Sequence, residues 1–259
     1  GSMFFDPETM DAQINNPGWL KALEDYKRGL AYNPPGALNN GSGDVRPLYA
    51  GGKVAMNIDW ADSGVLGATK GESAIAGNVR TAVLPGSTEI WNYKTKSWDK
   101  FDKPVASPFL AFGGWQLAVP ADSKNQAAAW SFVQVATSPE VSAKAIVTAN
   151  TGVNPYRLSH YSNIDNWSSI FTKAEAESYL SAQKASLDSP NVALDLRIPG
   201  FFNYTEVLEI ELSKALAGEE EPQAALDNIA AEWNKITDEF GRDKQLAAYR
   251  SAMGLPPLK

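Results

Sequence analysis

Residues 48–60, LYAGGKVAMNIDW, predict a short helix, a glycine turn and a strand in close succession. After the two glycines, apolar side chains alternate with small or polar ones up to Trp60, which is the period of two that is typical of a half-buried strand. The strand ends in a turn-rich tip that begins at Asp59 and contains Asp62. We therefore expect Asp59, Trp60 and Asp62 to lie together where this strand ends.

Helices outnumber strands in the rest of the predicted structure. Further short strands are expected at residues 80–84 and 115–119, and a hairpin or ordered loop at 87–108. Apolar residues at helical spacing, together with N-cap and proline signals, predict helices at 16–30, 45–50, 124–136, 138–149, 173–186, 203–217, from 222 onward, and at 242–253. This order predicts a mixed α/β fold with the helices weighted toward the C-terminus.

The composition argues against several classes of function. The chain has 259 residues and a formal net charge of -7, with one His and no Cys. An acidic chain is a poor binder of nucleic acid, and the lack of Cys excludes disulfides and thiolate metal sites. His160 lies in a polar stretch that predicts a surface loop, which disfavours a Ser-His-Asp triad or a zinc site. No cofactor or metal is expected, and no segment is long and apolar enough to span a bilayer.

Two carboxylates remain as candidates for chemistry. Asp59 and Asp62 flank Trp60, and glycosidases use two carboxylates with aromatic rings nearby. The same spacing is more often a turn-capping arrangement, so both interpretations stay open. The acidic run at 219–221 predicts instead a solvated loop between two helices.

Several tryptophans stand next to turn residues instead of within apolar runs. Trp60 precedes such a turn, and Trp115 follows the pair Gly113-Gly114. A ring at the end of a strand beside a glycine turn is able to reach a cleft, although packing at the edge of a core explains a single ring equally well. Trp60 and Trp115 are therefore candidate ligand contacts.

Five segments, in order, resemble the C-terminal part of bacterial family 1 extracellular solute-binding proteins, the group that includes maltose-binding proteins. They are NPGWLKAL at 16–23, the stretch at 48–60, VLPG at 83–86, several motifs between 113 and 140, and several between 198 and 233. The stretch at 48–60 carries the most specific match, with an aromatic residue and a glycine ahead of Ala55-Met56 and the later Trp60.

The resemblance implies an α/β fold of the periplasmic-binding-protein type II, with two lobes joined by a hinge and the solute held between them. It implies that residues 4–108 belong to the C-terminal lobe, that 109–155 return to the N-terminal lobe, and that 156–259 form the helical end of the C-terminal lobe. Residues 1–3 are interpreted as an expression scar. We expect a truncated, helix-rich form of the fold that lacks the N-terminal segment of full-length members.

The resemblance also implies a function. It makes the chain the substrate-binding component of an ABC importer, a periplasmic or extracellular protein without enzymatic activity that delivers a sugar or polyol to a membrane permease. Trp60 is implied as a stacking platform and Asp59 and Asp62 as acceptors of hydroxyl protons; the other implied contacts are Gly113, Gly114, Trp115, Arg197, Asn203 and Tyr204. The alternatives are a glycoside-acting enzyme that uses Asp59 and Asp62, and a truncated fragment that binds no small ligand.

Overall fold

The computed structural model describes residues 3–110 and 114–258. The chain forms two compact units, each built from separated segments. Unit 1 comprises Gly1–Asn39, Pro85–Val105 and Asp195–Lys259, and unit 2 comprises Asn40–Leu84 and Ala106–Leu194. Each unit therefore combines residues that lie far apart in the sequence. The lobe boundaries implied by the family resemblance stay a prediction.

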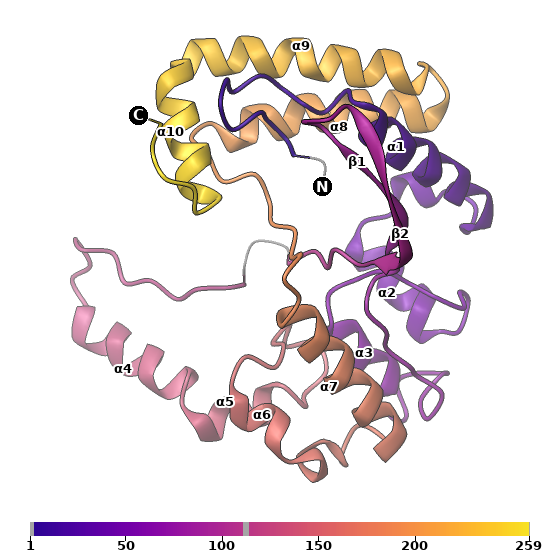
Figure 1. The fold of residues 1–259 in the computed structure, drawn as a ribbon. Helices are drawn as coiled ribbons and strands as arrows, with labels where there is room; N and C mark the ends of the chain where they lie inside the picture. Colours follow the sequence, from indigo (N-terminus) through magenta and orange to yellow (C-terminus); the bar gives the residue numbers. More distant parts are fainter. Residues whose placement is uncertain (1–2, 111–113, 259) are drawn as a thin grey trace. The chain divides into compact units, whose positions relative to one another are not determined.

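Unit 1 consists of helices and one hairpin (Figure 1). Helix α1 (Pro17–Gly29) is followed by short 3-10 helices at Leu30–Tyr32 and Ala37–Asn39, strands β1 (Ser87–Asn92) and β2 (Ser97–Val105), and helices α8 (Phe201–Ala217), α9 (Pro222–Phe240) and α10 (Arg242–Ala252). Helices α8 and α9 run side by side, and α1 and α10 both contact α9. Each helix that the sequence predicts in these segments is present.

The ends of these helices follow their local sequence signals. The Asn16 side chain accepts hydrogen bonds from the backbone N–H groups of Gly18 and Trp19 at 2.9 and 3.2 Å, so it caps α1 as predicted. Gly218 ends α8 with a φ of +80°, a left-handed conformation that favours glycine. The acidic residues after Gly218 form the loop to α9, as expected.

Strands β1 and β2 form an antiparallel hairpin, which confirms the hairpin predicted within 87–108. Trp91 and Trp98 are direct cross-strand partners, and their rings meet edge to face with centroids 5.5 Å apart. Aromatic cross-strand pairs of this kind stabilise small sheets. Packing within the hairpin therefore accounts for these two tryptophans.

The N-terminal segment, for which the sequence analysis predicts no element, supplies part of the core of unit 1. Phe5 is fully buried, and an isolated bridge pairs it with Ala12. The Phe5 ring stacks on Trp233 with centroids 5.2 Å apart. It meets the rings of Tyr204 and Tyr249 edge to face, at 5.6 and 5.7 Å. This aromatic cluster joins the N-terminal segment to α8, α9 and α10.

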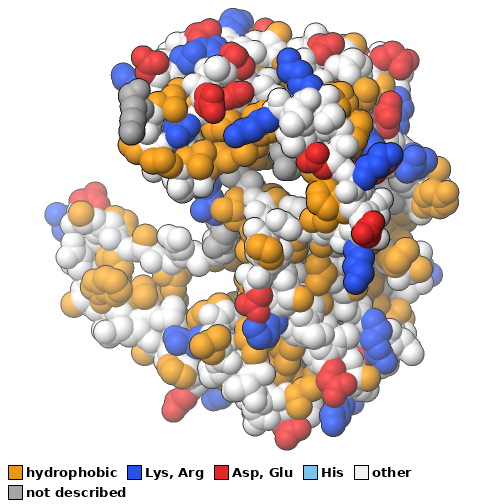
Figure 2. All heavy atoms as spheres, in the orientation of Figure 1, with side chains coloured by type: hydrophobic (Ala, Val, Ile, Leu, Met, Phe, Trp, Pro, Cys, Tyr) orange, Lys and Arg blue, Asp and Glu red, His pale blue; other side chains and the backbone are white. Residues whose placement is uncertain are grey.

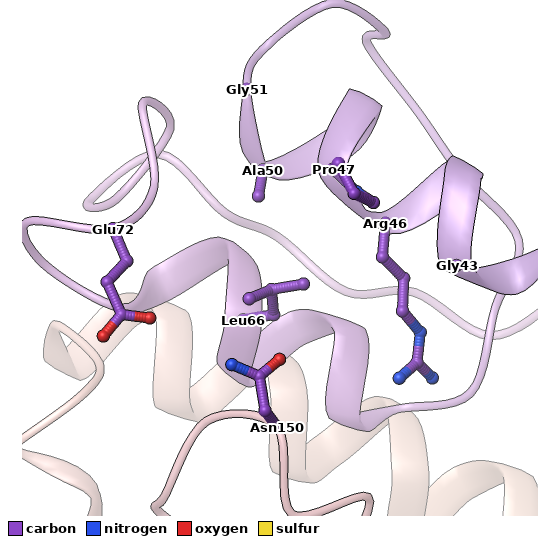
Figure 3. Close-up of a pocket in the computed structure, with 8 residues that line it drawn as sticks. All are labelled: Gly43, Arg46, Pro47, Ala50, Gly51, Leu66, Glu72 and Asn150. Carbon is purple, nitrogen blue, oxygen red and sulfur yellow. The ribbon is translucent and has the colours of Figure 1, made fainter.

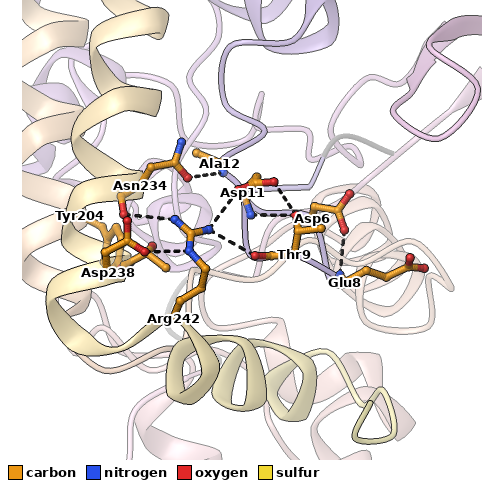
Figure 4. A network of polar contacts seen from close by, with 10 residues as sticks. Asp6, Glu8, Thr9, Asp11, Ala12, Tyr204, Asn234, Asp238 and Arg242 are labelled. Atoms are coloured by element: carbon orange, nitrogen blue, oxygen red, sulfur yellow. Dashed lines mark hydrogen bonds and ion pairs between the residues drawn. The ribbon is translucent and has the colours of Figure 1, made fainter. Parts of the chain in front are cut away.

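A polar network fastens the same segment nearer the surface (Figure 4). Arg242, the first residue of α10, donates hydrogen bonds to Asp238 Oδ1 at 2.8 Å and to Asp11 Oδ1 at 3.0 Å. It also donates to the carbonyl oxygen of Thr9 at 3.2 Å. The hydrogen bond with Asp238 is the main reason why the pKa of Arg242 lies above its ordinary value. The guanidinium therefore bridges the N-terminal segment and the junction of α9 with α10.

We expect Phe5→Ala to destabilise unit 1 by about 3–5 kcal/mol, because truncation of a fully buried ring leaves a cavity. Urea denaturation measures the free energy of unfolding, and hydrogen exchange should show that the backbone amides of α8, α9 and α10 lose protection. Phe202→Ala is the matched control, because that ring on α8 is 82% exposed; its effect should stay within about 0.5 kcal/mol. Equal free energies of unfolding for the two variants would contradict the role of the Phe5 ring in the core of unit 1.

Unit 2 is mainly helical. Its helices are α2 (Ser42–Ala50), α3 (Asp62–Ala68), α4 (Gln126–Ala136), α5 (Pro139–Ala145), α6 (Leu158–Ser162) and α7 (Lys173–Leu187), with a 3-10 helix at Ile164–Trp167. Its core is centred on Trp167, Phe171 and Tyr179, whose buried rings contact one another. The helices predicted in these segments are confirmed, although α5 ends at Ala145 and not near residue 149.

Helix α3 begins within a segment, 59–64, for which the sequence predicts a turn. The Asp-Ser-Gly sequence at its start is typical of turns. Two glycines, however, allow close packing: a β-carbon at Gly64 would lie 3.0 Å from the Tyr179 ring, and one at Gly67 would lie 2.8 Å from the Tyr49 ring. Tertiary contacts with α2 and α7 therefore stabilise a short helix whose intrinsic propensity is low.

The prediction of strands is wrong for three segments, which have no regular secondary structure: 53–60, 80–84 and 115–119. A strand is defined by hydrogen bonds to a neighbouring strand, and alternation of side chains does not supply that partner. Around residue 80 the backbone binds side chains of α7 instead. The N–H group of Val79 donates to Glu175 at 3.0 Å, and that of Thr81 donates to Ser178 Oγ at 3.4 Å.

The segment 53–60 presents its apolar side chains to the surface. Met56 is 85% exposed and Ile58 is 79% exposed, so the alternating face that predicted a half-buried strand is not covered by the described residues. Helix α4 likewise exposes Trp130 and Phe132, and Figure 2 shows hydrophobic side chains gathered over this helix. These apolar residues of both segments are therefore exposed among the described residues, and their spacing in the sequence did not predict burial.

The prediction that His160 lies in a surface loop is wrong, because the residue belongs to α6 and is only 3% exposed. Its Nδ1 accepts a hydrogen bond from the Tyr156 N–H group, and its Nε2 lies 3.3 Å from Ser142 Oγ. The Trp167 indole N–H donates to its carbonyl oxygen at 3.0 Å. Burial, and to a lesser extent the charge of Arg157, lowers the pKa of His160. Its polar neighbours in sequence predicted a loop, but its hydrogen bonds allow it to be buried.

A buried carboxylate fastens the loop at 77–79 to α7. Glu175 is 1% exposed, and its Oε1 accepts a hydrogen bond from the Val79 N–H group at 3.0 Å. Its Oε2 accepts hydrogen bonds from the backbone N–H and the hydroxyl of Thr172, both at 2.8 Å. Burial alone raises the pKa of Glu175, but the hydrogen bonds from Thr172 and Val79 outweigh it and lower that pKa below its ordinary value.

Glu175→Gln is expected to destabilise unit 2 by about 1–3 kcal/mol, because hydrogen bonds to a buried carboxylate are lost. The pKa of Glu175 is lower in the folded state, so its contribution is complete above the unfolded-state value of about 4.3 and is lost as the pH falls through the folded-state value. The free energy of unfolding, measured in urea between neutral pH and about pH 3, should therefore fall more steeply for the wild type than for Glu175→Gln. Glu177→Gln, at an exposed position of the same helix, should show the same pH dependence of unfolding free energy as the wild type. The same pH dependence in Glu175→Gln would refute the stabilising role of the Glu175 carboxylate.

Candidate functional site

The site is centred on Arg46, whose guanidinium holds two carboxylates at once. It donates from Nε and Nη2 to Asp59 at 3.0 and 3.3 Å, and from Nη1 and Nη2 to Asp62 at 2.8 and 3.0 Å. Both are two-point pairs, the geometry in which arginine–carboxylate bonds are strongest. The side chains of Arg46, Asp59 and Asp62 are 23%, 7% and 10% exposed. The structure therefore brings the two predicted aspartates together and shields them from most of the solvent.

The Trp60 ring adjoins this group, which we call the Arg46 cluster (Arg46, Asp59, Trp60 and Asp62). The guanidinium carbon lies 5.8 Å from the ring centroid, a cation–π contact. The Trp60 N–H group donates to Asp59 Oδ1 at 2.6 Å, and Trp60 is 40% exposed. A partly exposed ring, two carboxylates and one guanidinium thus meet at a single place in unit 2.

Local structure explains how these side chains converge. Arg46 lies on α2, and Asp62 lies in the first turn of α3, where the helix dipole favours a carboxylate. Asp59 lies in the irregular segment just before α3. The hydrogen bond with Asp59 is the largest of the effects that raise the pKa of Arg46 above its ordinary value, so the guanidinium stays charged. Arg46 therefore links α2 both to the segment before α3, through Asp59, and to the first turn of α3, through Asp62.

Arg46 is the member of the cluster that the sequence analysis misses. It lies in a predicted helix, 13 and 16 residues before the two aspartates, and nothing in the local pattern distinguishes it. The usable signal is charge: two carboxylates withdrawn from water next to an aromatic ring need a cation nearby. The cation closest in sequence on the preceding helix satisfies that need.

A pocket of about 470 Å³ adjoins the cluster within unit 2 (Figure 3). Its walls come from α2, α3 and three loops, with the lining residues Gly43, Arg46, Pro47, Ala50, Gly51, Leu66, Glu72 and Asn150. This volume falls at the lower end of the range for small-molecule sites. Asn150 adopts a φ of +61° and directs its amide toward the pocket below Leu66. Arg46 belongs to both the pocket and the cluster, so the two features are continuous.

The other predicted contacts in unit 2 lie outside this pocket. Gly113 lies outside the described residues. Gly114 has a φ of +98°, a conformation that favours glycine, and Trp115 is 82% exposed. Neither Gly114 nor Trp115 lines the pocket, and their predicted contacts with a solute stay predictions.

The remaining predicted contacts lie in unit 1, around the start of α8. Arg197 and Asn203 are exposed, and their roles stay predictions. Tyr204 is fully buried, with its hydroxyl 3.0 Å from Thr237 Oγ1 and accepting a hydrogen bond from Gln245 at 3.2 Å. This environment gives Tyr204 a packing role in the core of unit 1, and the geometry offers no support for its predicted contact with a solute.

The sequence matches the model of a family described as bacterial extracellular solute-binding proteins over residues 1–143. Because this match covers more than half of the 259 residues, the chain belongs to that family. The family membership that the five ordered segments predicted is therefore confirmed.

Two curated relatives resemble part of the chain. A mannitol-binding protein of Pseudomonas aeruginosa is 32% identical over 139 residues, which are 53% of this chain and 28% of that protein. A probable ABC transporter-binding protein of Deinococcus radiodurans is 28% identical over 153 residues, 59% of this chain and 32% of that protein. The chain thus spans about a third of the length of these relatives.

Solved structures confirm the fold class. Maltose-bound MalE3 of T. maritima has a TM-score of 0.71 at 21% identity, and the match covers 91% of this chain and 54% of the MalE3 chain. A solute-binding protein of Agrobacterium radiobacter in complex with ribitol has a TM-score of 0.64 at 21% identity, and the match covers 90% of this chain and 53% of that protein. A solute-binding protein of Agrobacterium vitis with bound D-mannitol has a TM-score of 0.62 at 22% identity, and the match covers 93% of this chain and 56% of that protein. The fold is the α/β periplasmic-binding-protein type II fold, helix-rich and with a small sheet.

Arg46→Gln should destabilise unit 2 by about 2–4 kcal/mol, because two partly buried carboxylates lose their shared cation. Arg46→Lys should have a smaller effect, because an ammonium keeps the charge without the two-point geometry. Urea unfolding tests both, and hydrogen exchange should localise the change to α2 and α3. The control is Arg28→Gln, which removes a guanidinium that is 72% exposed in its pair with Asp25. A loss no larger for Arg46→Gln than for Arg28→Gln would show that the cluster does not stabilise the unit.

Proposed function

We propose that this chain is part of the substrate-binding component of an ABC importer, and that the Arg46 cluster contacts a sugar or a polyol. The observation that carries the proposal is the partly exposed Trp60 ring beside two carboxylates held by Arg46. An aromatic ring stacks on the apolar C–H face of a sugar, and carboxylate oxygens accept hydrogen bonds from its hydroxyl groups. The pairing of a flat apolar surface with adjacent acceptors matches the two-sided chemistry of these solutes.

The polar groups of the site supply selectivity for hydroxyl groups. A buried acceptor that loses a partner costs about 1–3 kcal/mol, so a solute without hydroxyl groups is penalised when it covers the exposed part of Asp59 and Asp62 without donating a hydrogen bond. The adjoining pocket, at about 470 Å³, is large enough for a single sugar ring or a short polyol. Size and chemistry therefore favour the same class of solute.

The relatives support this class. One curated relative is named a mannitol-binding protein, and the solved proteins of the same fold are described with maltose, ribitol and D-mannitol. These ligands differ in length, but all are uncharged and carry many hydroxyl groups. A sugar or a polyol is accordingly the solute we propose for this chain.

We further propose a periplasmic or extracellular location and delivery of the solute to a membrane permease. The matching family is described as extracellular, and the Deinococcus radiodurans relative is named a probable ABC transporter-binding protein. Across residues 3–110 and 114–258, the structure contains no helix with the length and apolar character that a membrane span needs.

Trp60→Ala is expected to weaken binding of the solute by at least about tenfold, because the stacking surface is lost. Trp60→Phe should retain part of the affinity, because a smaller ring still stacks. Isothermal titration with D-mannitol, ribitol and maltose measures the effect. Trp130→Ala removes another exposed ring of unit 2, 58% exposed on α4, and should leave the affinity unchanged.

Two outcomes would contradict this proposal. The first is a wild-type chain that binds no member of the panel. The second is hydrolysis of chromogenic glycosides by the wild type that disappears in Asp59→Asn, which would favour the glycoside-acting enzyme instead.

A further inference from the structure

An arginine in a binding site ordinarily attracts anionic solutes, but Arg46 is already engaged by the protein's own carboxylates. A guanidinium has five N–H groups, and the hydrogen bonds to Asp59 and Asp62 use four of them. A carboxylate or phosphate of a solute would need the same two-point geometry, which the two aspartates fill. Arg46 is therefore a positioning residue: it holds Asp59 and Asp62 in place and offers little to an anion.

The Arg46 cluster also carries an excess of negative charge. Two carboxylates face one guanidinium, so one negative charge is left over. The side chains of Asp59 and Asp62 are only 7% and 10% exposed, and low exposure weakens the screening of charge by water and salt. An anion placed beside Trp60 would therefore be repelled, whereas an uncharged solute would not.

The adjoining pocket adds a third carboxylate, from a different part of unit 2. Its lining includes Glu72, which lies in the loop after α3, and the neutral amide of Asn150 (Figure 3). Among the described residues that line the pocket, Arg46 supplies the positive charge, and that charge is balanced by Asp59 and Asp62. The lining of the pocket thus offers hydrogen-bonding groups to the hydroxyls of a solute. Its cation, Arg46, is already paired and is not available to the carboxylate of an acidic solute.

We infer that this site discriminates by charge: it binds neutral sugars and polyols and rejects the sugar acids that differ from them by one terminal carboxylate. The inference rests on the proposed function and narrows its solute class. Like charges that face each other across a binding surface are strongly unfavourable, and we expect the acid to bind at least about tenfold more weakly than its neutral partner.

Three matched pairs test the inference by isothermal titration of the full chain: D-mannitol with D-mannonate, ribitol with D-ribonate, and maltose with its uronic acid, in which the CH2OH group of the non-reducing ring is a carboxylate and both rings are kept. For any pair whose neutral member binds, the acid should bind at least about tenfold more weakly at low salt, and most of this difference should remain as ionic strength rises, because the two carboxylates are poorly screened. Equal affinities within a pair would overturn the inference and leave the proposed function standing. If neither member of any pair binds, or if only the acids bind, both proposals fall.

Charge-removing variants separate the electrostatic role from a structural one. Asp62→Asn and Glu72→Gln each remove one negative charge and should lower the ratio of acid to neutral dissociation constants several-fold. Glu72→Gln keeps the test decisive if Asp62→Asn does not fold, because Glu72 is exposed. Arg46→Lys should weaken neutral binding without relaxing the preference, because the positive charge is kept. Asp122→Asn, at an exposed position before α4, should leave the ratio unchanged. An unchanged ratio in Glu72→Gln and in folded Asp62→Asn would refute the inference.

Discussion

The pairing of Arg46 with two aspartates is the interaction on which the candidate site depends. It joins α2 to the residues on either side of Trp60, so the position of the ring follows from where one cation sits. Neither aspartate would tolerate its low exposure without a partner. The geometry of the cluster also depends on the packing of α3, because Gly64 and Gly67 allow this helix to approach two tyrosine rings. A charge interaction and a steric one therefore act together to present Trp60.

Each unit is stabilised by contacts between segments that are distant in sequence. In unit 1 the buried Phe5 ring meets Trp233 of α9 and Tyr249 of α10. In unit 2 the Glu175 carboxylate accepts the backbone N–H group of Val79. Loss of either contact leaves a cavity or an unpaired buried polar group, both of which cost more than a surface interaction. The long-range contacts thus decide whether the local elements assemble into a core.

Burial separates residues that look equivalent as candidates for solute contact. Trp60 and Tyr204 are both aromatic residues that the sequence resemblance implied as solute contacts, yet Trp60 is 40% exposed and Tyr204 is fully buried between Trp233 and Phe5. A partly exposed ring presents surface on which a solute stacks, whereas a buried ring completes a core. The distinction favours the cluster in unit 2 as the candidate site and gives the tyrosine a packing role in unit 1.

The sequence alone predicted the family from five ordered segments, most of the helices, and a hairpin or ordered loop at 87–108. Helix ends depend on signals within a few residues, such as Asn16 before α1 and Gly218 after α8. The sequence also placed Asp59, Trp60 and Asp62 at one point of the chain. The tertiary structure was needed to show that Arg46 joins them, that His160 is buried, that α3 is helical, and that the alternating segment at 53–60 is not a strand. Helix hydrogen bonds close within four residues, whereas strand pairing, burial and ion pairs depend on partners that no local pattern specifies.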